Sequence, residues 1–311
     1  MKRLLYIILY VVLTASASAQ EVIDTAQFVA IYDYECRTQN DEDAPVTDRM
    51  QVVVQVGRTV TKSMPLSAYQ RTDEITSTDA AMEFQEAMLH MPTVWTGYPN
   101  GQTTVREFIF PHDYEGYEPT PDIVWTLTDN TLTIGGYYCQ TATCKFRGVA
   151  WTVCYTEEIP SSAGPWRLRG LPGLIVKAVS KREQSQARLN SAEREQARTE
   201  FKAESEAHTF CLTELRQERL RVGASAGMAA SITAPEHRPD VQRMKDAKLL
   251  KHRNEIYGNR QYAKNPTYYV PDLGGSINNM DVLNHDDQQL VFANGRPLLT
   301  KAHVYQPLEL K

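Results

Sequence analysis

The sequence predicts a mainly β protein of the α+β class: a curved antiparallel meander that approaches a half-barrel and carries a few peripheral helices. Three observations predict this fold. Short runs rich in β-branched and aromatic residues recur between residues 28 and 215, and such runs are typical of strands. The short connections between many of these runs favour antiparallel neighbours. A sheet with this many strands must twist, and it tends to curl.

The first residues have the three parts of a secretory signal peptide. Lys2 and Arg3 supply the positive start, residues 4–13 are apolar, and residues 17–19 (ASA) offer the small side chains that a signal peptidase requires. The apolar run is too short to span a membrane as a helix, which takes about 20 residues. We therefore expect cleavage before Gln20 and an exported protein, in the periplasm, at the outer membrane or outside the cell, with no transmembrane segment after cleavage.

The expected strands follow one another with few interruptions. The run 149–156 has the clearest strand pattern, because Trp151, Val153 and Tyr155 alternate with smaller or more polar residues. Residues 129–130 (DN) suit a turn between two of the runs. The expected strands are 28–36, 50–56, 103–110, 123–128, 131–139, 149–156, 174–180 and 208–215.

Two helices are expected outside the meander. Residues 78–90 place apolar side chains at helical spacing, and Thr78 can cap the first turn. Residues 240–257 form the second expected helix, with Asp240 as its cap and Gly258 at its end.

A charged segment, residues 181–207, interrupts the meander and has the composition of a helix, with no Gly or Pro. Two interpretations stay open: a solvated helix that projects from a hairpin, or an arm that binds a partner. Residues 221–239 are rich in small residues, which favours a flexible linker. The chain is thus expected to comprise a signal peptide (1–19), a β-rich domain that carries the charged helix (20–220), the linker, and a helix followed by irregular chain (240–311).

Composition and motifs exclude several classes of function. The net charge is −5, and no segment is basic enough to suggest a nucleic-acid partner. The sequence contains no zinc-protease helix motif, phosphate-binding loop or dinucleotide-binding loop. We therefore expect no cofactor and name no catalytic residue.

Five cysteines are candidates for disulfides, because an exported protein meets an oxidising compartment. Their number is odd, so at least one thiol stays free or pairs outside the chain, and the sequence does not reveal the pairing. The gap between Cys139 and Cys144 differs from the usual spacing of zinc ligands, so no metal site is expected. The candidates are Cys36, Cys139, Cys144, Cys154 and Cys211.

The most distinctive stretch is GPWRLRGLPGLIVKAV, residues 164–179. Pro172 suits the second position of a β-turn, and Gly173 permits the positive φ that a type II turn needs at the third. The aliphatic side chains of the motif would enter a core, and none of its side chains transfers a proton, so a structural turn is expected. The alternative is that the turn rims a ligand cavity. The motif residues are Gly170, Leu171, Pro172, Gly173, Leu174 and Ile175.

Together with residues 135–160, this motif closely resembles the GLPGLI family of exported proteins from Bacteroidota. The resemblance runs from about residue 28 to residue 215, and it implies a largely β, exported protein, often associated with outer-membrane transport systems and without an established activity. Residues 181–207 depart from the family pattern, in which a short turn leads into the next strand, and the carboxy-terminal third fits the pattern poorly. The matching residues are Trp125, Asp129, Gly136, Tyr137, Cys139, Phe146, Arg147, Gly148, Trp151, Tyr155, Glu158, Ile159, Pro160 and the motif itself.

The leading hypothesis is a non-catalytic envelope protein that binds an apolar ligand, or an outer-membrane protein partner, on the concave side of its sheet. The expected layout is reminiscent of the half-barrel lipoprotein carriers. Two alternatives remain open: an envelope hydrolase that acts on peptide or glycan, and an assembly or structural subunit of an outer-membrane transport system. The hydrolase requires acid and base residues that converge in a polar cleft, and the subunit requires an exposed apolar patch.

Overall fold

The computed structural model describes residues 21–39, 45–69, 91–109, 112–181, 206–216, 231–257, 280–285, 288–293, 296–298 and 308–309. Four expected features lie wholly or mostly outside these residues: the signal peptide at 1–19, the helix at 78–90, the charged helix between 182 and 205, and the first part of the linker, up to residue 230.

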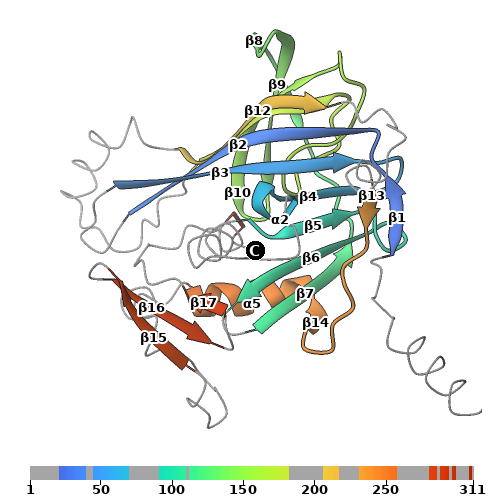
Figure 1. Ribbon diagram of the computed structural model, residues 1–311. Helices are drawn as coiled ribbons and strands as arrows, with labels where there is room; N and C mark the ends of the chain where they lie inside the picture. The colour runs from blue at the N-terminus through green and yellow to red at the C-terminus, as the bar shows by residue number, and fades with distance from the viewer. Residues whose placement is uncertain are drawn as a thin grey trace, which may run out of the picture.

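One large, curved and open sheet of twelve strands confirms the mainly β prediction (Figure 1). The strand order is β14-β7-β6-β5-β4-β3-β2-β12-β11-β10-β9-β8. Neighbours are antiparallel except for β14, which runs parallel to β7. The strands are β2 (Phe28–Gln39), β3 (Pro45–Val56), β4 (Thr61–Pro65), β5 (Thr93–Thr96), β6 (Gln102–Ile109), β7 (His112–Pro119), β8 (Thr126–Ile134), β9 (Tyr137–Phe146), β10 (Val149–Thr156), β11 (Leu174–Lys181), β12 (Glu206–Arg216) and β14 (Gln242–Lys245).

Two smaller sheets and two helices complete the described structure. β1 (Val22–Thr25) pairs with β13 (Ser231–Thr233). The carboxy-terminal region, expected to be irregular, contains a three-stranded antiparallel sheet. The helices α2 (Leu66–Tyr69) and α5 (Asp246–Tyr257) both lie against the large sheet, and neither combines the length and hydrophobicity that crossing a membrane requires. The strands of the carboxy-terminal sheet are β15 (Met280–His285), β16 (Gln288–Ala293) and β17 (Arg296–Leu298).

The β8–β9 hairpin turns at a different place from the one expected. Gly135 and Gly136 form the turn, with φ of +56° and +89°, and glycine reaches this left-handed region without a steric cost. Residues 129–130 lie inside β8, where the register shifts between Thr128 and Thr131. The two residues that the sequence pattern assigned to a turn therefore form a bulge within β8.

Helix α5 begins later than expected, at Asp246, because residues 242–245 form β14. Without β14, strand β7 would be the edge of the sheet, and the parallel pairing satisfies backbone groups that an edge leaves unpaired. Pairing with a distant strand therefore overrides the local helical pattern. In the same way, the end of the expected linker, residues 231–233, is recruited as β13.

The main core lies on the concave face of the sheet. Its members come from strands as far apart in the sheet as β6 and β9, so they meet only because the sheet curls. A smaller core on the opposite face lies under β1 and β13 and contains Trp95 and Ile232. Among the largest side chains of the main core, each less than 2% exposed, are Trp151, Tyr32, Tyr34, Tyr155 and Phe210.

Candidate functional site

The connection between β10 and β11, residues 157–173 (the motif loop), folds into the concave side of the sheet instead of crossing the surface. Gly170 N donates a hydrogen bond to Ser162 O at 2.9 Å, which holds the loop in a compact shape. Its central residues, 163–168, are all buried. Connections ordinarily run over the surface of a protein. The buried position of this loop means that its side chains contact the interior of the protein.

The motif enters the core through its three aliphatic side chains. Leu171, Leu174 and Ile175 are 3%, 0% and 0% exposed. The Tyr32 hydroxyl donates a hydrogen bond to Ile175 O at 2.8 Å, which ties the motif to β2. These contacts are those of a packed turn.

The two glycines of the motif are required for different reasons. Gly170 has a φ of +95°, and a Cβ there would meet only Trp125 Nε1, at 3.8 Å. Gly173 lies outside the left-handed region, but a Cβ there would lie 2.0 Å from Thr156 O. The expectation that Pro172 and Gly173 form a type II turn with positive φ at Gly173 is therefore wrong. The close approach of two backbone segments explains this glycine.

Trp166 is a second anchor of the motif loop, and its backbone is strained. Its φ is +56°, which is rare for a bulky L residue. Its side chain is 2% exposed and stacks on Trp151 with ring centroids 5.7 Å apart, and its backbone N–H donates to Ser63 Oγ at 3.0 Å. Such a conformation persists only where the surroundings over-determine it. The next residue, Arg167, points into the interior.

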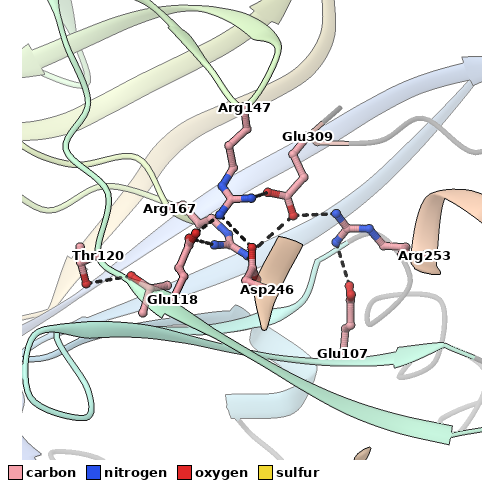
Figure 2. Close-up of polar contacts among 9 residues, drawn as sticks. Glu107, Glu118, Thr120, Arg147, Arg167, Asp246, Arg253 and Glu309 are labelled. Carbon is pink, nitrogen blue, oxygen red and sulfur yellow. Dashed lines mark hydrogen bonds and ion pairs between the residues drawn. The ribbon is translucent and has the colours of Figure 1, made fainter. Parts of the chain in front are cut away.

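Arg167 belongs to a buried network of three arginines and four carboxylates, here named the arginine clasp (Figure 2). Arg167 Nη1 lies 2.7 Å from Glu118 Oε1, and its Nη2 lies 2.6 Å from Asp246 Oδ1. Arg147 contacts the same two carboxylates, with its Nη2 2.8 Å from Asp246 Oδ2. The members of the clasp are Arg147, Arg167, Arg253, Glu107, Glu118, Asp246 and Glu309.

The clasp joins parts of the sheet that lie near its opposite edges. Arg147 is in the β9–β10 turn and Arg167 in the motif loop, whereas Glu118 lies on β7 and Asp246 begins α5. The curved sheet is therefore bridged across its open side by charged side chains (Figures 1 and 2).

Arg147 occupies a turn position that ordinarily favours Asn, Asp or Gly. Arg147 and Gly148 have φ of +50° and +82°, as the two central residues of a type I′ hairpin turn do. The left-handed conformation costs a non-glycine residue about 1–2 kcal/mol, which the ion pairs of the side chain offset. The sequence analysis assigned no ion-pair role to Arg147 or Arg167. An Arg-Gly turn where Asn-Gly is usual is a local signal that could have drawn attention to Arg147.

Burial and charge act on the clasp carboxyl groups in opposite directions. Burial favours the neutral form of Glu309, but the positive charges of the three arginines outweigh it and lower its pKa to about 2. Burial dominates at Glu107 and Glu118, whose pKa values are raised. Glu107 and Glu118 therefore hold a proton more tightly than an exposed glutamate does.

A cleft of about 610 Å³ opens beside the motif loop. This volume falls within the range of about 300–1,000 Å³ that is usual for ligand pockets. Phe28 is the half-buried apolar residue of the lining, whereas Val56, Trp166 and Leu168 are 5%, 2% and 1% exposed, and many of the other lining residues are Gly, Ser or Thr. Trp166 and Leu168 flank Arg167 in the chain, so one stretch of the motif loop contributes to both the cleft and the clasp.

The described lining of the cleft contains few ionisable side chains. Its charged side chains are Arg58, Arg169 and Asp122, and it contains no His, Cys, Lys or Glu. Ser161 and Ser162 therefore lack a base within this lining, and Asp122 lacks the second carboxylate that acid–base hydrolysis uses. In the part of the chain that the structure describes, no three His, Cys, Asp or Glu side chains are grouped so as to hold a metal ion.

No disulfide joins any two of the five cysteines, all of which lie among the described residues. Cys139 and Cys144 lie on one unbroken strand, β9, at opposite parity and about 17 Å apart at the usual rise per residue. Cys154 and Cys211 both pair in register with Lys177, which places them about 9.6 Å apart across two strand spacings. Both separations exceed the Cα distance of about 7 Å that a disulfide tolerates.

The thiols do not resemble catalytic nucleophiles. Cys36 is buried opposite His208 in the β2–β12 ladder. Burial raises the pKa of Cys144 to about 12, and it also raises the pKa values of Cys139 and Cys154. Since the thiolate is the reactive form, burial disfavours the reactive form of these three thiols.

Comparison with known proteins gives only distant similarities. No family model and no curated protein matches the chain. Among solved structures, the chain is similar to PNGF-II in two crystal forms, at 11% identity and TM-scores of 0.39 and 0.40, over 72% of this chain. It spans about a third of the length of PNGF-II, 32% and 33% in the two forms. A LolA-superfamily protein from Nitrosomonas europaea matches at 9% identity and a TM-score of 0.24, over 63% of this chain and 88% of that one. None of these TM-scores reaches 0.5, so none assigns a fold family or a function.

Proposed function

We propose that this chain is an exported member of the GLPGLI family that acts in the cell envelope as a non-catalytic binding protein. The amino-terminal signal pattern supports the compartment, and the motif at residues 170–175 supports the family. The observation that carries the binding role is the cleft of about 610 Å³ that the motif loop helps to line. The absence of an acid–base pair from its described lining disfavours the hydrolase alternative.

The ligand we infer is an extended segment of an outer-membrane protein partner. Its backbone N–H and C=O groups find polar partners among the Ser and Thr residues of the lining, and its apolar side chains find the half-buried Phe28. This largely polar lining suits a polypeptide backbone better than a purely apolar molecule. The concave side, where an apolar ligand was expected, is filled by the main core and the clasp.

A photo-crosslinking amino acid at position 162 tests this proposal. Ser162 is exposed and lines the cleft, whereas Thr131 is equally exposed on β8 and lies outside the lining. We expect irradiated cells to form a discrete adduct with an outer-membrane protein from position 162 and none from position 131. Peptide mapping of the adduct should place the crosslink in one short segment of that partner.

The other outcomes separate the alternatives. An adduct of small mass at position 162 would identify the protein as a carrier of a small molecule. Equal adducts at both positions, or none at position 162, would contradict a binding role for the cleft.

A further inference from the structure

Leu308 and Glu309 lie deep in the concave interior. Leu308 is 7% exposed and packs in the main core, and Glu309 is 1% exposed. We propose that the three arginines of the clasp form a binding site for a glutamate-bearing peptide segment of a partner polypeptide, and that Leu308–Glu309 is the built-in, displaceable occupant of this site. The site is distinct from the cleft, and its assignment does not rest on the function proposed for the cleft.

Guanidinium groups from three separate elements converge on Glu309 (Figure 2). Glu309 Oε1 lies 2.6 Å from Arg253 Nη2 and 3.7 Å from Arg167 Nη2, and Glu309 Oε2 lies 3.0 Å from Arg147 Nη1. The planar fork of a guanidinium group matches a carboxylate in shape as well as charge. The site therefore discriminates a carboxylate from a neutral side chain of the same size.

The arginines keep their positions through partners other than the occupant. Arg147 and Arg167 each contact Glu118 and Asp246, and Arg253 contacts a third carboxylate. A site that its own partners preorganise avoids much of the ordering cost of binding. Among the described residues, the buried Nε atoms of Arg147 and Arg167 have no hydrogen-bond partner, so donors in the site are left over for a ligand or for water.

The chemistry of the occupant suits exchange better than permanent packing. Taking a carboxylate out of water is costly, and apolar residues of similar volume often stabilise a protein interior equally well. Leu308–Glu309 belongs to no described strand or helix, and its described contacts are those of its side chains with the main core and the clasp. A segment held by side chains of this kind can leave the site and be replaced by another segment with the same charge.

The test keeps the chain intact while it folds. A recognition sequence for a site-specific protease is inserted after Lys301, and the folded protein is then cleaved. A fluorescent peptide with the sequence of residues 305–311 is added as the probe. We expect saturable binding of the probe with release of the native segment, while the near-UV circular dichroism of the sheet is retained.

Two comparisons make the result specific. The same peptide with Glu309→Gln should bind at least about 30-fold more weakly, because truncating one partner of a buried charge pair is costly. In the cleaved protein, Arg167→Gln should weaken binding, whereas the control Arg49→Gln, at an exposed position on β3 outside both the clasp and the cleft, should not. The proposal is overturned if the probe fails to enter at high excess, if the glutamine peptide binds equally well, or if the sheet unfolds when the segment leaves.

Discussion

The motif loop is anchored in the interior at two places, and different forces hold each. At Leu171–Ile175, aliphatic side chains enter the core and a glycine allows the backbone to touch β10. At Trp166–Arg167, a strained backbone presents a cation to Glu118 and Asp246, which lie 49 and 79 residues away along the chain. The first anchor depends on local properties of the sequence, whereas the second depends on charges brought together by the curl of the sheet.

The two anchors should also differ in their tolerance of substitution. Burial of a Leu or Ile side chain stabilises the folded protein by about 1.5–3 kcal/mol. A similar aliphatic residue at the same position retains most of this stabilisation. Removing one partner from a buried ion pair costs about 3–5 kcal/mol, because the remaining charge stays buried and uncompensated. The charged anchor is therefore expected to be the more sensitive of the two.

The largest effect is expected from Arg167→Ala, which leaves Glu118 and Asp246 facing one arginine fewer. The free energy of unfolding should fall by about 3–5 kcal/mol, measured by urea denaturation. The control Arg169→Ala should change it by less than about 0.5 kcal/mol, since the Arg169 side chain makes no ion pair in the described structure. A loss below about 1 kcal/mol for Arg167→Ala would show that the clasp is not an energetic anchor.

Gly173→Ala tests the apolar anchor and should have the next largest effect. The new Cβ would lie 2.0 Å from Thr156 O, so β10 and the motif must separate. We expect a loss of about 1–3 kcal/mol, as for other overpacked sites, in the same denaturation assay. The neighbouring Pro172→Ala, at an exposed position, should lose less than about 1 kcal/mol. Equal losses for the two variants would argue against the close backbone contact.

Gly170→Ala separates backbone strain from steric contact within the motif. Its Cβ would meet nothing closer than 3.8 Å, but its φ is +95°. Strain alone predicts a loss of about 1–2 kcal/mol, and Gly170→Asn should lose less, because Asn tolerates positive φ better than Ala. If Ala and Asn were equally destabilising at this position, strain at φ would not be the cause.

The smallest effect is expected from Glu107→Gln, because Arg253, its ion-pair partner, keeps Glu309 as a second partner. The effect should depend on pH. Burial raises the pKa of Glu107 above its ordinary value of 4.5, so the folded protein binds this proton more tightly than the unfolded chain does. Ionisation of Glu107 therefore reduces stability as pH rises from about 4.5 through the raised pKa, and glutamine avoids this loss.

The stability of Glu107→Gln relative to the parent should thus increase with pH across this window, by no more than about 1.4 kcal/mol per pH unit. Urea denaturation at several pH values between 4 and 8 measures the difference. A relative stability that decreases with pH would show that the carboxyl group of Glu107 is stabilised in its ionised form.

Much of the fold could be predicted because its signals are local. Alternation along residues 149–156 predicted β10, and the apolar character of Leu174 and Ile175 predicted their burial. Predictions failed where a distant partner decided the outcome. Residues 242–245 pair with β7 instead of extending a helix, and Gly173 is required by Thr156 instead of by a turn.

The sequence by itself determined the β-rich meander and the apolar half of the motif loop, because alternation and side-chain volume act over a few neighbouring residues. Only the tertiary structure decided that Arg147, Arg167 and Arg253 meet Glu309, and that a cleft opens beside the motif loop. The physical reason is that a charge in a sequence does not identify its partner. In this protein the ion pairs form only when the curl of the sheet brings residues near its opposite edges within ion-pair distance. The site where they meet is largely shielded from water.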